Sequence, residues 1–101
     1  MEIKEQIFTR YIHLIDFCRL NWDEASLEKI ENAFRFAQSI IGERTFKTGE
    51  VILSHSLEVA NVIATEIGMG VDSVVAGILH NIMYSGFEVK DARGEIEKKI
   101  W

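Results

Sequence analysis

The chain has 101 residues, of which 48% are hydrophobic and 27% charged, and it has no proline and a formal net charge of −5. This length is enough for one domain with a single core, and the composition is too apolar for intrinsic disorder. The negative charge disfavours DNA or an anionic membrane as a partner, because both attract a positive surface. We therefore predict a single domain over residues 1–101 that binds neither DNA nor membrane.

Targeting signals and cysteine usage bear on the compartment. The N-terminus has neither the basic start nor the apolar run of a signal peptide, and no apolar window approaches a membrane span. The single cysteine, Cys18, has no second cysteine with which to form an internal disulfide. These features predict a cytoplasmic protein.

The first two predicted elements are amphipathic helices, from Ile3 to about Leu20 and from about Glu24 to Ile41. Asp23 is expected to cap the second helix, and Gly42 is expected to end it in a left-handed conformation. Apolar residues recur in both at three- and four-residue steps, at Ile7, Tyr11, Leu14, Ile15 and Cys18 in the first and at Leu27, Ile30, Phe34, Ala37 and Ile41 in the second.

The periodicity is lost from Glu43 to Leu53, which predicts one long irregular loop of the kind that carries binding groups. A third helix is expected from about His55 to Ile67, with Ser54 as its N-cap. A fourth is expected to start near Asp72, also as an N-cap, and to break at Ser85 and Gly86.

A fifth helical pattern runs from Val89 to Trp101, through Val89, Ala92, Ile96 and Ile100. The predicted fold class is therefore all-α, a bundle of about five helices. The pattern is still in progress at the last residue, which is expected of an N-terminal fragment of a longer protein.

The three histidines differ in their surroundings. His13 lies on the first predicted helix with no other ligand type nearby, which favours a surface or packing role. His55 and His80 stand at the ends of apolar helices, and spacing alone favours two partly buried, hydrogen-bonded imidazoles over a pair of metal ligands.

Two motifs surround these histidines. Residues 47–60, KTGEVILSHSLEVA, resemble the signature R-K-S-G-E-P-Y-x-x-H-P-x-x-V-A of RelA/SpoT-type proteins, and residues 76–81, AGILHN, resemble their A-A-L-L-H-D. Residues 33–37, AFRFA, match a third family motif, A-x-x-F-A. On these motifs the chain resembles the HD-type phosphohydrolase domain of that family.

The resemblance implies a helical bundle whose pocket holds manganese and removes the 3′-diphosphate from guanosine tetraphosphate. In the family two histidines and two aspartates hold the metal, and a Glu-Asp pair helps to activate water. His55 and His80 occupy the histidine positions, but Asn81 replaces the first aspartate, and Tyr84 and Ser85 replace the Glu-Asp pair. The second metal-binding aspartate would lie beyond the last residue.

These replacements predict an inactive site. Manganese prefers anionic oxygen ligands, and a neutral Asn carbonyl does not supply that charge. Without a bound ion nothing lowers the pKa of water, and without the Glu-Asp pair no general base remains. We expect no catalytic residue and no resident cofactor, with His55, His80 and Asn81 as vestigial metal-site positions.

The nucleotide-facing positions of the motif are Phe46, Lys47 and Thr48, and Phe46 replaces an arginine. The phenylalanine is expected either to cover the emptied pocket or to stack on a guanine base, which would allow weak nucleotide binding. Ser56 stands where the family has proline, and Ile52 and Ile82, together with Met83, are expected to fill the pocket.

Three functional hypotheses follow. The first is a catalytically inactive domain that acts as a structural or regulatory module and binds a protein partner or a second copy of itself. The second is a residual manganese-dependent 3′-pyrophosphohydrolase. The third is a nucleotide sensor that binds without turnover.

Overall fold

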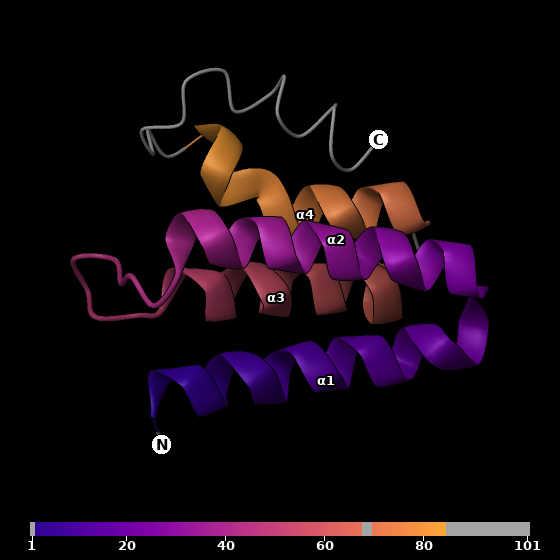
Figure 1. The fold of residues 1–101 in the computed structure, drawn as a ribbon, viewed down its shortest axis with the longest axis horizontal. Helices are drawn as coiled ribbons and strands as arrows, with labels where there is room; N and C mark the ends of the chain where they lie inside the picture. The colour runs from indigo at the N-terminus through magenta and orange to yellow at the C-terminus, as the bar shows by residue number, and fades with distance from the viewer. Residues whose placement is uncertain (1, 68–69, 85–101) are drawn as a thin grey trace.

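A computed structural model describes residues 2–67 and 70–84, and within them the chain is all helical with no strand. Successive helices run in alternating directions and pack side by side (Figure 1). The prediction of an all-α fold is confirmed, whereas the helix expected over residues 89–101 lies outside the described residues. The helices are α1 (Ile3–Asn21), α2 (Glu24–Ile41), α3 (Ile52–Val62) and α4 (Val71–Tyr84).

The first two helices have nearly the predicted bounds, and α2 has the predicted end groups. The Ser26 N–H donates a hydrogen bond of 2.9 Å to the Asp23 carboxylate, which therefore caps α2 and holds the pKa of Asp23 below its ordinary value. Gly42 follows the last residue of α2 with φ of 56° and ψ of −129°. The positive φ favours glycine, but the ψ value differs from the left-handed helical conformation that was predicted.

Helix α3 begins three residues before the predicted start. Ser54 is buried within the helix and does not cap it; Val51 occupies the N-cap position without a side-chain hydrogen bond. A bridge between Thr45 and Val51 and a 3.0 Å bond from the Ile52 N–H to the Arg44 carbonyl bring the chain into the helix instead. At its far end α3 continues as a π-helix over Ile63–Ile67.

The prediction for the start of α4 was also wrong in detail. The helix begins at Val71, so Asp72 lies in its first turn and is not the N-cap. Its carboxylate lies 3.8 Å from Lys29 Nζ on α2, while the Gly70 carbonyl accepts hydrogen bonds from the Ser73 and Val74 N–H groups. The carboxylate retains the favourable position of an acid near a helix N-terminus.

The hydrophobic core lies among all four helices. Helix α3 packs on both α1 and α4, and α2 packs on α4. Gly77 permits the close approach of α3 and α4, because a Cβ atom there would lie 3.3 Å from the Ala60 Cα. The most buried large side chains come from every helix: Leu14 and Cys18, Ile30 and Ile41, Leu53 and Leu57, and Val74, Val75, Ile78 and Leu79.

The length and hydropathy of the described helices bear on whether they could cross a membrane. Among the helices described, none combines the length and the apolar character that crossing a bilayer requires.

Candidate functional site

The loop between α2 and α3 forms one wall of the candidate site. The Phe46 N–H donates to the Glu50 carbonyl at 2.8 Å, and the Gly49 N–H donates back to the Phe46 carbonyl at 2.9 Å. Gly49 has φ of 94°, which closes this turn and which a residue with a Cβ adopts only under strain. The turn therefore fixes Phe46 and Glu50 beside the start of α3.

Three rings meet at this place. His55 lies in the first turn of α3 and His80 near the end of α4, and their ring centroids are 6.0 Å apart with the planes at 61°. The Phe46 ring stands edge-on to His55, with centroids 5.9 Å apart. The structure thus brings together two residues that are 25 positions apart in the sequence.

Each histidine has one ring nitrogen engaged. His80 Nδ1 lies 2.5 Å from the carbonyl oxygen of Gly77, and His55 Nδ1 lies 3.3 Å from Glu50 Oε1. Both imidazoles are half-buried, which leaves an edge of each within reach of solvent. Glu50 and Gly77 were not predicted to contact the histidines, because loop geometry and backbone carbonyls leave no signal in a periodicity pattern.

Asn81 is turned towards α3. Its side chain is buried, and the amide nitrogen donates a hydrogen bond of 2.8 Å to Ser56 Oγ. The Ser56 hydroxyl in turn donates to the Ile52 carbonyl at 3.2 Å. Two positions at which the chain departs from the family motifs are therefore in direct contact.

The remaining predicted site residues lie in different settings. Lys47 and Thr48 are exposed in the turn that follows Phe46. Tyr84 is the last residue of α4, and Ser85 lies outside the described residues. His13 is exposed on α1, where it lines a separate shallow pocket with Gln6, Thr9 and Arg10.

The donor set does not fit manganese. His55 and His80 offer imidazole nitrogen, and the Asn81 amide nitrogen donates to Ser56 Oγ. Within the part of the chain that the structure describes, no group of three or more His, Cys, Asp or Glu side chains could hold a metal ion. Manganese prefers several hard, anionic oxygen ligands, which these residues do not provide.

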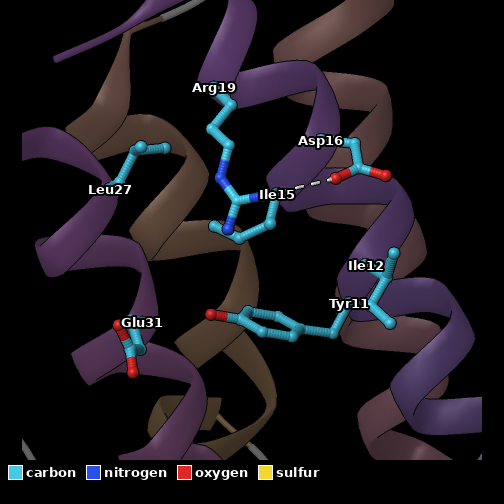
Figure 2. A pocket seen from close by; sticks show the side chains of 7 residues that line it. All are labelled: Tyr11, Ile12, Ile15, Asp16, Arg19, Leu27 and Glu31. Carbon is cyan, nitrogen blue, oxygen red and sulfur yellow. Dashed lines mark ion pairs between the residues drawn. The ribbon is translucent and has the colours of Figure 1, made fainter. Parts of the chain in front are cut away.

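A second hollow lies between α1 and α2 and was not predicted from the sequence. This groove has a volume of about 450 Å³, and Tyr11 points across it from α1 towards α2 (Figure 2). The phenol has a pKa above its ordinary value, first because of burial and second because of the nearby Glu31 carboxylate. The other lining residues are Ile12, Ile15, Asp16, Arg19 and Leu27.

Nothing in this groove resembles a catalytic arrangement. Asp16 is paired with Arg19, with 3.8 Å between their charged atoms, and Glu31 is paired with Arg35 at 2.6 Å. The Tyr11 ring stacks on Phe34 with centroids 4.0 Å apart. The charged groove residues are therefore already paired, within the groove or with a neighbour, and the histidine cluster remains the better candidate site.

Comparisons with known proteins give one informative similarity. No family model matches the chain, and no solved structure matches it. The chain is 35% identical over 77 residues to the guanosine-3′,5′-bis(diphosphate) 3′-pyrophosphohydrolase of Aquifex aeolicus (strain VF5). The aligned stretch spans 72% of this chain but only 11% of that relative. The chain is therefore related to a short part of a SpoT/RelA-like protein.

Proposed function

We propose that this chain is a non-catalytic helical module of the guanosine tetraphosphate hydrolase type, and that it acts as a structural or regulatory domain. The similarity to the Aquifex pyrophosphohydrolase supports the relationship. The two histidines at the motif positions lie side by side, which is consistent with a helical pocket descended from that enzyme class. Residues 1–101 would form one such domain.

The observation that carries the proposal is the state of Asn81. This residue replaces the carboxylate next to the second histidine, and it is buried and hydrogen-bonded to Ser56. An amide held in this way supplies no charge to a metal ion. Without the ion, the pKa of water stays high and no cation offsets the negative charge of the departing phosphate. Both effects make hydrolysis much slower.

Tyr84 and Ser85 support the same conclusion from the sequence. They stand where the family has the Glu-Asp pair, and neither side chain is an effective general base near neutral pH. If catalysis is lost, the fold can still provide a surface that binds another molecule. The expected partners are a protein or a second copy of this chain, and the relative is long enough to contain several further domains.

The test is pyrophosphate release from guanosine tetraphosphate by the purified chain in the presence of manganese. The Aquifex enzyme is the positive control, and the His80→Ala variant gives the background. We expect the chain and the variant to release pyrophosphate at the same rate as buffer with metal. Manganese-dependent release that His80→Ala abolishes would instead establish the residual hydrolase.

A nucleotide sensor without turnover is the second candidate, and the position of Phe46 favours it. The half-buried ring stands beside His55, and the exposed Lys47 follows it in the same turn. A ring of this kind stacks on a base and a lysine meets a phosphate. Equilibrium binding of guanosine tetraphosphate tests this, because Phe46→Ala should weaken binding by about 1–3 kcal/mol if the ring stacks on guanine.

A further inference from the structure

Helix α1 carries apolar side chains on two of its faces. One face supplies Leu14 and Cys18 to the core, whereas Phe8 and Ile12 lie on the other, with 53% and 45% of their surfaces exposed. Figure 1 shows α1 at one edge of the bundle formed by the described helices. Large apolar side chains that are exposed together on one helix are typical of a surface that binds a partner.

The outer face of α1 has a regular order of residue types. Glu5, Phe8, Ile12, Ile15 and Arg19 follow one another at alternating three- and four-residue steps, and we call them the α1 stripe. This spacing places all of them along one side of the helix. Glu5 and Arg19 are the exposed charged ends, and Ile12 is the centre, seven residues from each.

The α1 stripe borders the groove between α1 and α2. Ile12 and Ile15 line this groove from α1, and Leu27 lines it from α2 (Figure 2). Phe8 lies next to the groove, where its ring stands edge-on to Tyr11 with centroids 6.5 Å apart. The same face therefore holds an apolar hollow and, beside it, an exposed aromatic ring of the kind that anchors protein interfaces.

This face is complementary to itself. When two copies of α1 are placed antiparallel about a two-fold axis through Ile12, Glu5 of each copy faces Arg19 of the other, about 10 Å from the axis. Phe8 of each copy then lies opposite Ile15 and the groove of the other. A partner with one sign of charge would instead be repelled at one end of the stripe.

The two charged ends are free to make this contact. Arg19 is 67% exposed, and its guanidinium lies 3.8 Å from the Asp16 carboxylate, which is a loose pair for a group with five N–H donors. Glu5 is exposed in the first turn of α1. Two pairs of opposite charge would therefore flank an apolar centre, which is the usual arrangement of a polar rim around an interface core.

We propose that the α1 stripe and the adjoining groove bind a second copy of this chain through an antiparallel, two-fold symmetric contact between the α1 helices. Ile12 of one copy lies against Ile12 of the other, and each Phe8 enters the groove of the other copy. The contact closes as a dimer, because both copies use the same surface. The inference names the partner in the proposed function and rests on it, since a module without catalysis acts through such a surface.

The first experiment measures the mass of the full chain by sedimentation over a range of concentrations. We expect the mass to rise from 11.6 kDa to twice that value as the concentration increases. Ile12→Lys places two lysines against each other at the axis and should weaken the dimer by at least about tenfold. Leu20→Lys is the matched control, because Leu20 is 85% exposed on α1 but lies outside the stripe, and it should leave the dimer unchanged.

The second experiment tests the antiparallel register by reversing charges. Glu5→Lys places lysine against Arg19 of the other copy, and Arg19→Glu places glutamate against Glu5, so each variant alone should dimerise about threefold or more weakly. In an equimolar mixture both end contacts again join opposite charges. We expect the mixture to form a heterodimer more tightly than either variant forms its own dimer, and circular dichroism shows that each variant is folded.

Three results would overturn the proposal. The first is a wild-type chain that stays monomeric at every concentration, including the case in which Ile12→Lys lowers its stability because its own residues cover the groove. The second is a dimer that Leu20→Lys weakens as much as Ile12→Lys does. The third is a mixture of the charge variants that dimerises no better than each variant alone.

Pyrophosphate release separates this inference from the proposed function. A monomeric chain that releases no pyrophosphate from guanosine tetraphosphate would overturn the dimer alone. A dimeric chain with manganese-dependent release would overturn the non-catalytic function, although the surface on α1 would remain as described.

Discussion

The Asn81 amide and the Ser56 hydroxyl face each other at 2.8 Å across the interface of α3 and α4. The family resembled by this chain has aspartate and proline at these positions, and neither residue could make the same contact. A proline has no side-chain acceptor, and an ionised aspartate has no proton to donate. The two replacements are therefore complementary, and together they add a buried hydrogen bond to the packing between two helices.

Removing the acceptor of this hydrogen bond should change the stability of the protein more than removing the donor. Ser56→Ala removes the acceptor of a buried amide donor, and we expect it to lower the free energy of unfolding by about 1–3 kcal/mol. Asn81→Leu should cost less, because the serine hydroxyl still donates to the Ile52 carbonyl. The double variant should regain stability relative to Ser56→Ala alone. Urea denaturation of all four proteins measures this, and strictly additive effects would contradict it.

The thiol of Cys18 gives a prediction for alkaline pH. The side chain is fully buried in α1, and burial raises its pKa from the ordinary value of 9.0 to about 11. Above the ordinary value the unfolded chain loses this proton while the folded chain keeps it. Stability should therefore be unaffected well below pH 9 and should fall as the pH rises from about 9 towards 11.

The measurement is urea denaturation of the wild type and of Cys18→Ala between about pH 8 and about pH 10. Tyr11, whose pKa is raised from the ordinary value of 10.0, begins to contribute near the upper end of this range, but it does so in both proteins. The variant should be less stable at pH 8, because the core loses packing, but its stability should depend less on pH. If the thiol had no role in the loss of stability at alkaline pH, the free energy of unfolding would depend on pH in the same way in both proteins.

At the scale of the helices, the contact between α3 and α4 determines the geometry of the site. A Cβ atom on Gly77 would lie 2.9 Å from Ile63 Cδ1 and 3.3 Å from the Ala60 backbone. The absence of a side chain lets α4 approach α3 closely enough for the Ser56–Asn81 bond to form. The Gly77 carbonyl also holds His80, so this glycine both spaces the helices and orients one ring.

Replacing Gly77 separates packing from helix propensity. Valine has a higher helix propensity than glycine and a lower one than alanine, so propensity alone predicts that Gly77→Val stabilises α4 and that Ala76→Val destabilises it slightly. Because Gly77 is buried against α3 and Ala76 is exposed, we expect the opposite order of stability, with Gly77→Val less stable than Ala76→Val. Gly77→Val should lower the unfolding free energy by about 1–3 kcal/mol through overpacking, and thermal unfolding compares the two variants.

The sequence predicted the presence of the helices more accurately than the residues at which they begin. The bounds of α2 followed from a clear apolar period and from Asp23 and Gly42, which act through local chemistry. The start of α3 was missed because Ser54 has the chemistry of a cap, whereas the chain enters this helix through a backbone bridge between Thr45 and Val51. Backbone pairing of this kind involves no side chain, so it leaves no mark on the residue types from which a cap is predicted.

The candidate site, like the fold, could be predicted from the sequence only in part. The motifs identified His55, His80, Asn81 and Phe46, and the structure places the rings of His55, His80 and Phe46 together. The motifs did not reveal that Asn81 would bond to Ser56, because that contact depends on the packing of two helices. The metal-site assignment of these residues stays a prediction until metal binding is measured.

Across the described part of the molecule, the buried residues form one continuous core to which α1, α2, α3 and α4 all contribute. Helix α1, for which the sequence offered no motif, packs on α3 and supplies Leu14 and Cys18 to that core. Among the helices that the structure describes, none has a separate hydrophobic cluster that would keep it folded when another is lost. The described residues should therefore unfold as a unit.

This predicts a single cooperative transition in urea. Helix content followed by circular dichroism and the reactivity of the Cys18 thiol with a disulfide reagent should change at the same urea concentration. The thiol reports on α1, whereas the dichroism reports on all helices. Thiol exposure at a lower urea concentration than the loss of helix content would show that α1 detaches first and that the domain has two units.

Burial along α4 bears on how the chain reaches its fold in the cell. Five of its apolar side chains, those of Val74, Val75, Ile78, Leu79 and Ile82, are at most 2% exposed, and α4 is the last helix described in chain order. While a ribosome makes the 14 residues of α4, which takes about one to three seconds, the apolar surfaces of α2 and α3 that it later covers remain open to water. A nascent chain in this interval presents a target for chaperones and proteases, and the arrival of α4 ends that exposure.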